Sequence, residues 1–174
     1  LELAANLQDK GFVYSSPIVR MRQLFNLDLC IRPCQSFKGN PLNFIRRGKG
    51  NTVEEPLVDT VIFRQNTEGL YAGVEWTDPP PNVRTALESH PKFKAFKNVP
   101  GPELAISTRI FTQTGCTRIV SEAFKYADKF GYKNVTICEK PNVIRETSGM
   151  MLETGKRIQK DYPHIQLWNT NIDA

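Results

Sequence analysis

The chain has 174 residues, of which 40% are hydrophobic and 24% charged, a composition typical of a globular domain and not of a disordered segment. Its net charge of +5 is scattered and is not interleaved with aromatic residues, so a nucleic-acid partner is not expected and an anionic small molecule suits the cations better. No apolar run approaches the roughly 20 residues that a membrane-spanning helix needs, so we expect no membrane partner.

The cysteines show no spacing that is typical of a metal site or of a disulfide framework. They are Cys30, Cys34, Cys116 and Cys138, and the sequence contains only two histidines. Free thiols in predicted strands favour a reducing, cytoplasmic compartment. We expect these cysteines to be buried in the core, as free cysteines usually are.

Both ends of the chain interrupt a pattern. The first residues, "LELAANLQDKG", read as a helix already under way, and the last, "NTNIDA", follow a strand without a closing element. We therefore expect the chain to be a segment of a longer protein.

Short helices and strands fill the first third of the chain. We expect an amphipathic helix over 1–11, a loop over 12–19 and a second short helix over 20–27. Residues 28–37 alternate like a strand, and several Gly and Pro residues mark 38–56 as a loop.

The middle of the chain predicts strands over 58–63 and 70–76, then a long excursion. Prolines recur through residues 77–102, which is typical of an arm that leaves the core and not of a core element. Residues 103–112 read as the strand that returns from this arm.

The last third of the chain alternates strands with longer helices. Residues 114–130 carry apolar side chains on one face, and a second helix is expected over 147–161, between strands at 134–140 and 165–173. This alternation favours an α/β fold with a layered sheet. We expect the two helices to pair with the same helices of a second copy across a two-fold axis.

Three arginines stand at positions that could serve one anionic ligand. Arg22 lies on a predicted helix, Arg32 in a strand, and Arg64 at the end of a strand before the polar turn 66–68. The planar guanidinium group matches a carboxylate, and a polycarboxylate needs several of them. Each arginine alone is more commonly a solvated surface residue, and only their conjunction points to a site.

Two further residues follow predicted strands. Lys140 can act as a base if burial or a neighbouring cation lowers its pKa, and Asp173 has the oxygen ligands that a hard metal ion prefers. The alternative for both is an ordinary solvated side chain at a turn.

Four segments together resemble the β-decarboxylating dehydrogenases, the family of isocitrate, homoisocitrate and isopropylmalate dehydrogenases. "RQLFNLDLCIRP" resembles the family's paired-arginine segment, and "FRQNTEGLYAG" is similar to its "FRENTEG.YAG". "EKPNVIRETSG" resembles "HKANIMK.TDG", and "NIDA" matches the segment that ends in a metal-binding Asp. The match runs from about residue 14 to residue 174.

The resemblance implies a set of substrate contacts. Arg22, Arg32 and Arg64 would hold substrate carboxylates, and Ser16 would touch the distal group of the substrate. Asn142 would lie near both the substrate and the nicotinamide of the cofactor.

The resemblance also implies the chemical roles. Lys140 would help to remove the hydroxyl proton of the substrate, and Tyr71 would protonate the enol that forms after decarboxylation. Asp173 would ligate Mg²⁺ or Mn²⁺. In the family Lys140 and Asp173 serve the active site of the partner subunit, so a homodimer with shared active sites is implied.

The implied activity is the oxidative decarboxylation of a 2-hydroxy polycarboxylate with NAD or NADP. We rank isocitrate, converted to 2-oxoglutarate in the tricarboxylic acid cycle, first, homoisocitrate second and 3-isopropylmalate third. The loop over 14–20 would contact the part of the substrate in which these three compounds differ. A non-catalytic regulatory or dimerisation subunit of the same family is the alternative.

The implied fold is the small domain of the isocitrate/isopropylmalate dehydrogenase fold, with two dimer-forming helices and a protruding arm. Residues 1–34 would be a remnant of the large domain with the substrate loop, and residues 35–174 the small α/β domain with a clasp-like arm at about 72–112. The segment alone is expected to be inactive.

Five residues depart from the family pattern. Glu139 replaces a usual His and Ser148 a usual acid. The remaining departures are Gln65 for Glu, Arg145 for Lys, and Ile18 for the Asn of many isocitrate enzymes. None of them removes a primary catalytic group, but together they leave the substrate open.

Overall fold

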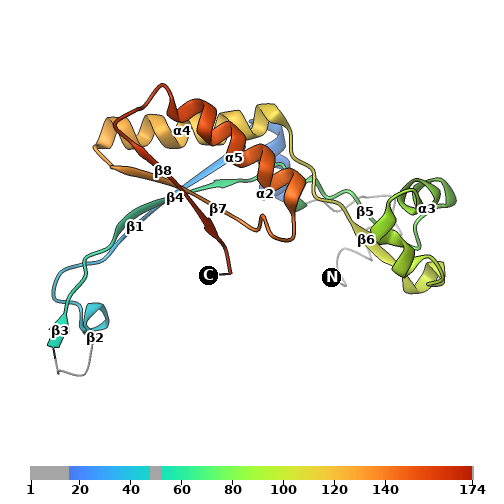
Figure 1. The fold of residues 1–174 in the computed structure, drawn as a ribbon, viewed down its shortest axis with the longest axis horizontal. Coiled ribbons are helices and arrows are strands. Elements are labelled where there is room, and N and C mark those ends of the chain that lie inside the picture. Colours follow the sequence, from blue (N-terminus) through green and yellow to red (C-terminus); the bar gives the residue numbers. More distant parts are fainter. Residues whose placement is uncertain (1–15, 48–51, 174) are drawn as a thin grey trace. The chain divides into compact units, whose positions relative to one another are not determined.

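The computed structural model describes residues 16–47 and 52–173 (Figure 1). The chain divides into two compact units, Leu1–Asn66 and Thr67–Ala174. Helices and strands are mixed, as the predicted α/β class requires. The helix predicted over 1–11 lies outside the described residues. No helix within the described ranges is long and apolar enough to cross a membrane.

The described part of the first unit contains a short helix and a long hairpin. Helix α2 (Pro17–Leu24) precedes strand β1 (Leu29–Gln35), which pairs antiparallel with β4 (Asp59–Gln65). The helix begins three residues earlier than predicted, because Pro17 has the backbone angle that starts a helix. Asn26 follows the helix with a φ of 52°, a left-handed conformation that interrupts the helical path.

The segment between β1 and β4 is not the plain loop that the sequence predicts. It contains a 3₁₀ turn, η1 (Pro41–Asn43), and a small antiparallel pair, β2 (Ile45–Arg47) with β3 (Thr52–Glu54). The Asn40 side chain accepts a hydrogen bond from the Leu42 amide and so starts η1. Of the residues that predicted a loop, Gly39 has a φ of 83° and Pro41 begins η1, so these two shape the turn before the hairpin.

The core of the second unit is a strand–helix–strand unit. Strand β7 (Asn134–Glu139) runs parallel to β8 (Gln166–Asn171), and α5 (Arg145–Gln159) connects them. Helix α4 (Gln113–Phe130) packs beside α5 on the same face of this strand pair (Figure 1). The prediction of these four elements is confirmed.

Tight packing holds α5 against the strands. Phe124 and Ile165 are fully buried, and Ile137 is 7% exposed. Gly155 allows the close approach of α5, because a Cβ atom at this position would lie 2.5 Å from Cδ1 of Ile137.

The arm contains more regular structure than the sequence predicts. It includes α3 (Pro81–Glu88) and the 3₁₀ turns η3 (Pro91–Phe96) and η4 (Gly101–Glu103). Nη2 of Arg84 donates to the carbonyl oxygens of Lys97 and Val99, each at 2.6 Å, and so ties α3 to the segment that returns.

Two strand predictions at the base of the arm are too long. Residues 70–76 divide into a 3₁₀ turn, η2 (Leu70–Ala72), and β5 (Glu75–Thr77), because Gly73 between them is left-handed, with a φ of 64°. The strand predicted over 103–112 is limited to β6 (Ala105–Ser107), which pairs antiparallel with β5.

The cysteines do not share one environment. Cys116 on α4 is buried as expected, but Cys30 is half-buried, and Cys34 and Cys138 are exposed. Cys138 is exposed because β7 alternates, so that Ile137 points into the core and Cys138 away from it. The expectation of core cysteines is therefore wrong for three of the four.

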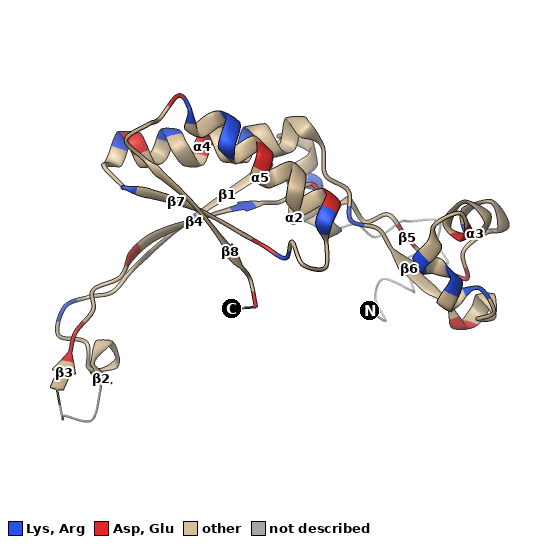
Figure 2. Cartoon of the chain, viewed as in Figure 1, with Lys and Arg blue, Asp and Glu red and all other residues tan. Residues whose placement is uncertain are grey.

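The apolar faces of α4 and α5 point into the unit itself. Met151 is 9% exposed and Ile158 is 7% exposed, so these side chains are already covered. The outward side of α5 is charged, and Lys156 pairs there with Glu153 at 2.7 Å (Figure 2). Any contact with a second copy through this surface would therefore be largely polar.

Candidate active-site residues

The hairpin of the first unit brings two of the three predicted arginines onto one face. In the register of β1 and β4, Arg32 lies opposite Ile62 and Cys30 lies opposite Arg64. Side chains two residues apart on a strand share a face, so Arg32 and Arg64 are diagonal neighbours. Such a pair can face the carboxylates of one ligand.

Cys30 is a neighbour of this arginine pair, although the sequence pattern predicts it in the core. Nε of Arg32 donates to Sγ of Cys30 at 3.2 Å, so the thiol helps to orient the guanidinium group. The alternation of β1 could have indicated this, since Cys30 and Arg32 are two residues apart.

Arg22 and Ser16 lie outside the hairpin register. Arg22 is half-buried in the last turn of α2, and Ser16 immediately precedes the same helix. Ile18 and Val19, expected in the substrate loop, lie instead in the first turn of α2, and they are 61% and 41% exposed.

The second unit brings together the predicted base and the predicted metal ligand. The pair Glu139 and Asn171 ends the β7–β8 ladder, and the Ile172 amide donates to the Glu139 carbonyl oxygen at 2.9 Å. Lys140 and Asp173 follow the two strands, and Nζ of Lys140 forms an ion pair with the Asp173 carboxylate. The carboxyl ends of parallel strands are where ligands bind in α/β folds.

Asn142 lies in the turn that Lys140 begins. The Lys140 carbonyl oxygen accepts hydrogen bonds from the amides of Val143 at 3.2 Å and Ile144 at 2.9 Å. These bonds close the turn between β7 and α5, and the Asn142 side chain is exposed on it. Lys140 and Asn142 therefore move with one short segment.

Tyr71 lies in the 3₁₀ turn η2 and is 49% exposed. Gly69 just before it has a φ of 69° and forms an isolated antiparallel bridge with Ile110. Arg64 belongs to the first unit and Tyr71 to the second, so the two residues are held by different parts of the fold.

Glu68, one of the polar residues of the turn after Arg64, has a structural role. Its carboxylate accepts a hydrogen bond from the Thr112 amide at 2.9 Å and another from the Thr112 hydroxyl group. Thr112 in turn caps α4 by accepting from the Gly115 amide at 2.9 Å. A carboxylate at the N-terminus of a helix is favourable, and a Cβ at Gly115 would lie 2.3 Å from Oε2 of Glu68.

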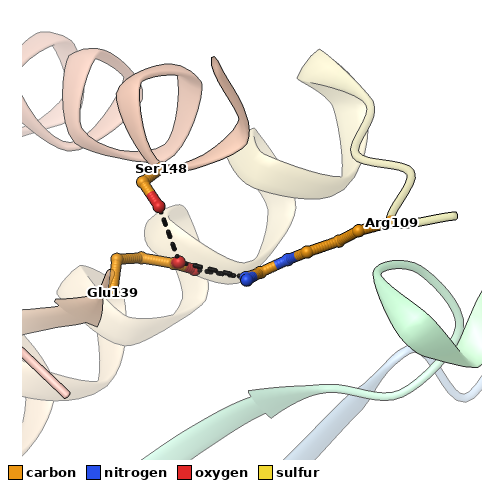
Figure 3. Close-up of polar contacts among 3 residues, drawn as sticks. All are labelled: Arg109, Glu139 and Ser148. Atoms are coloured by element: carbon orange, nitrogen blue, oxygen red, sulfur yellow. Dashed lines mark hydrogen bonds and ion pairs between the residues drawn. The ribbon is translucent and has the colours of Figure 1, made fainter. Parts of the chain in front are cut away.

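A polar cluster connects the end of β7 to α5. Nη2 of Arg109 donates to both carboxylate oxygens of Glu139, at 3.1 and 3.0 Å, and Oγ of Ser148 donates to Oε2 of Glu139 at 3.0 Å (Figure 3). Two of the departures from the family pattern, Glu139 and Ser148, therefore contact each other. The two departures therefore compensate for each other: the carboxylate that the family pattern has on the helix, at the position of Ser148, is here supplied by Glu139 on the strand.

The nearby carboxylates affect one thiol. Burial raises the pKa of Cys116 from its ordinary 9.0 to about 11, and the negative charges of Glu68 and Glu139 add to this shift. The thiol is therefore protonated at neutral pH and is a poor nucleophile.

The described residues do not form a complete metal site. They contain no group of three or more His, Cys, Asp or Glu side chains that could hold an ion. Asp173 could supply one carboxylate, but its partner within the described chain is the Lys140 ammonium group. A divalent ion here would need ligands from outside the described residues.

Comparison with known proteins identifies the family. A family model described as isocitrate/isopropylmalate dehydrogenase matches residues 5–174. The chain belongs to this family. The resemblance that the four sequence segments indicate is thereby confirmed.

Individual members of this family are similar to nearly the whole chain. A 3-isopropylmalate dehydrogenase of Methanothermobacter thermautotrophicus is 32% identical over 90% of the chain. One of the mitochondrial regulatory subunits of the NAD isocitrate dehydrogenase of Dictyostelium discoideum is 30% identical over 94%. The crystal structure of isocitrate dehydrogenase from Methylococcus capsulatus covers 94% of the chain at 32% identity, with a TM-score of 0.65.

The chain spans only part of these isocitrate/isopropylmalate dehydrogenase relatives. It covers 37% of the first, 37% of the second and 40% of the third. The match therefore concerns a region of a larger isocitrate/isopropylmalate dehydrogenase architecture.

Proposed function

We propose that the protein containing this chain oxidatively decarboxylates a 2-hydroxy polycarboxylate, with NAD or NADP as the hydride acceptor. The pairing of Lys140 with Asp173 supports this proposal most directly. It joins two residues to which the sequence resemblance assigns roles in the same chemistry, at the strand ends where α/β folds bind ligands.

The first step needs a base. A hydride passes from the carbon that bears the hydroxyl group to the nicotinamide, and the hydroxyl proton must leave at the same time. Lys140 is proposed to help remove that proton. Asn142, on the same turn, is proposed to lie near the nicotinamide and the substrate.

The second step needs an acid. The β-keto acid loses CO₂, and the electron pair of the broken carbon–carbon bond leaves an enolate, which becomes the 2-oxo product when its carbon takes up a proton. The Tyr71 hydroxyl group is the proposed donor of the proton that this carbon then takes up. Its partial exposure on η2 leaves it open to a ligand.

Substrate binding is proposed for the arginine face of the hairpin. Arg32 and Arg64 share this face, so each can hold a carboxylate of one substrate. Arg22 and Ser16 are proposed to complete the contacts. No step is assigned to a divalent ion, because Asp173 alone does not form its site.

Isocitrate is the first candidate substrate, homoisocitrate the second and 3-isopropylmalate the third. The exposed side chains of Ile18 and Val19 could contact the apolar tail of 3-isopropylmalate, so this substrate stays a candidate beside isocitrate. A homodimer with active sites shared between subunits is proposed with each of these substrates. The proposed organisation is a large-domain remnant over 1–34 and a small domain over 35–174.

The second candidate function is that of a non-catalytic regulatory or dimerisation subunit of the same family. The similarity to a protein named as regulatory in the NAD isocitrate dehydrogenase favours it. The presence of Arg32, Arg64, Tyr71, Lys140 and Asp173 favours catalysis, because a protein without chemistry has no need of this set.

The test is an assay of the whole protein that contains this chain. Isocitrate, homoisocitrate and 3-isopropylmalate are each supplied with NAD or NADP, with and without Mg²⁺, and reduced cofactor and released CO₂ are measured. We expect equal amounts of both products with one of the substrates. If no substrate yields reduced cofactor, the catalytic proposal fails and the regulatory one stands.

A further inference from the structure

We propose that Arg109, Glu139 and Ser148 are positioning residues that fix the turn over 140–144 and thereby the position of Lys140. This inference rests on the proposed function, since it concerns the residue proposed as the base. The three side chains themselves are not proposed to touch the substrate.

The cluster encloses the turn from both sides. Glu139 is the last residue of β7, immediately before Lys140, and Ser148 lies in the first turns of α5, immediately after the turn. Their side chains meet at 3.0 Å, as Figure 3 shows. The turn that carries Lys140 and Asn142 is therefore closed at its base by one hydrogen bond.

Arg109 anchors this closed turn to a third segment. It lies between β6 and α4, and its Nη2 contacts both oxygens of Glu139. The Arg109 guanidinium carbon also lies 4.7 Å from the centre of the Phe111 ring, a second contact that restricts the side chain. Arg109 thus links the segment between β6 and α4 to the end of β7.

The burial of the cluster makes it stiff. The side chain of Glu139 is 11% exposed and that of Arg109 is 29% exposed, while Ser148 is 2% exposed. A hydrogen bond between charged groups is about twice as strong as a neutral one, and it strengthens where water is excluded. Removal of Arg109 leaves the mostly buried Glu139 carboxylate without this cation and with the Ser148 hydroxyl group as its remaining partner in the cluster, so the local structure must shift.

The backbone of Glu139 extends the effect to the other member of the ion pair. Its carbonyl oxygen accepts the hydrogen bond from Ile172, the residue before Asp173. A displacement of Glu139 therefore moves Lys140 and Asp173 together. The cluster sets the geometry of the base and of its carboxylate partner at once.

The experiment uses the whole protein with the variants Arg109→Ala, Arg109→Lys and Ser148→Ala. The control is Lys125→Ala, which removes an exposed ion pair with Glu122 at 2.7 Å on α4 and leaves the cluster intact. Turnover, KM and amide hydrogen exchange of residues 140–144 are measured well below the melting temperature of every variant.

We expect Arg109→Ala to lower kcat by about 10- to 100-fold, because a small displacement of a catalytic group has effects of this order. KM should change less than about threefold, since Arg32 and Arg64 are not altered. Exchange over 140–144 should accelerate at least tenfold. Arg109→Lys should recover part of kcat, Ser148→Ala should lower it several-fold, and Lys125→Ala should match the parent protein.

Two outcomes overturn the positioning role. If kcat of Arg109→Ala equals that of Lys125→Ala in an active parent protein, the inference fails and the proposed function stands. If kcat falls but exchange over 140–144 does not change, the loss arises elsewhere and the inference again fails. If Arg109→Ala does not fold, Ser148→Ala decides by the same two measurements.

If the parent protein oxidises none of the three substrates, the proposed function fails by itself. The cluster is then judged by hydrogen exchange, which needs no activity. Faster exchange over 140–144 in Arg109→Ala than in Lys125→Ala still supports the control of the turn, and equal exchange contradicts it.

Discussion

Lys140 and Asp173 lie far apart in the sequence and form an ion pair, because they follow adjacent parallel strands whose last residues are in register. The crossover helix α5 makes this possible, since parallel neighbours need a connection that returns the chain to the same edge. A separate element, the β1–β4 hairpin, carries the arginine face. Substrate grip and proton transfer are therefore assigned to different units of the fold.

Substitution of Arg64 by Ala should raise KM and lower turnover in the whole protein. One carboxylate would lose a charged partner, which costs about 2–5 kcal/mol when the contact is desolvated. Arg32→Ala should act similarly. The loss of binding free energy in the double variant should be smaller than the sum of the losses in the two single variants, because neighbouring residues couple. Lys38→Ala, an exposed cation on the same unit, is the control in steady-state kinetics. Values for Arg64→Ala within twofold of the parent would remove this residue from the site.

Two glycines on the long helices should respond to Ala with opposite signs. Gly115→Ala would place a Cβ atom 2.3 Å from Oε2 of Glu68, so the carboxylate must move and give up its hydrogen bonds to Thr112. The free energy of unfolding should fall by about 1–3 kcal/mol, as expected for lost hydrogen bonds to a charged group. Gly149→Ala has open space on α5 and should raise it by up to about 1 kcal/mol. Urea unfolding measures both. Equal effects of the two changes would contradict the packing of Glu68 against α4.

Cys116 should make stability fall in alkaline solution. Its pKa is about 11 in the folded protein and 9.0 in an ordinary setting, so between these values the unfolded chain loses a thiol proton that the folded chain keeps. Fewer bound protons in the unfolded state mean that the free energy of unfolding decreases as pH rises from 9 to about 11. Cys116→Ala should show a shallower decrease over this window, and the exposed Cys138→Ala should not. Identical slopes for all three proteins would argue against a buried thiol.

Sequence patterns predicted the elements that rest on local signals. The apolar face of α4 and the Gly131 that ends it, with a φ of 76°, are both visible in the sequence. The split of residues 70–76 was missed, because a single glycine, Gly73, outweighed the strand propensity of its neighbours. The β2–β3 pair was missed because its strands have three residues each, too few to show alternation.

In the candidate site too, the sequence identifies individual residues but not the contacts between residues that are distant in the chain. The sequence marks Arg32 and Arg64 individually, but their shared face depends on the register of two distant strands. The role of Glu68 depends on Thr112, which is 44 residues away, so the position of Glu68 in a polar turn next to an arginine does not reveal that role. Contacts between residues this far apart in the sequence depend on the fold and cannot be read from the spacing of residues along the chain.

Tyr71 should be needed only after CO₂ has left. Tyr71→Phe removes one hydroxyl group and keeps the ring, so packing on η2 should survive. We expect the variant to reduce the cofactor but to release the protonated product slowly, with a defect of about 10²–10⁴-fold in that step. Product formation from the supplied β-keto acid measures it directly. A parent-like rate on this intermediate would exclude Tyr71 as the proton donor.

The most direct test of the proposed mechanism is hydride transfer by Lys140→Met in the whole protein. Met has a similar length but cannot accept a proton, so reduction of NAD or NADP from the 2-hydroxy acid should fall by about 10²–10⁴-fold. The same variant should still decarboxylate the β-keto acid supplied to it, because that step comes after the base has acted. A variant that reduces the cofactor at the parent rate, or that loses both reactions equally, would contradict the role proposed for Lys140.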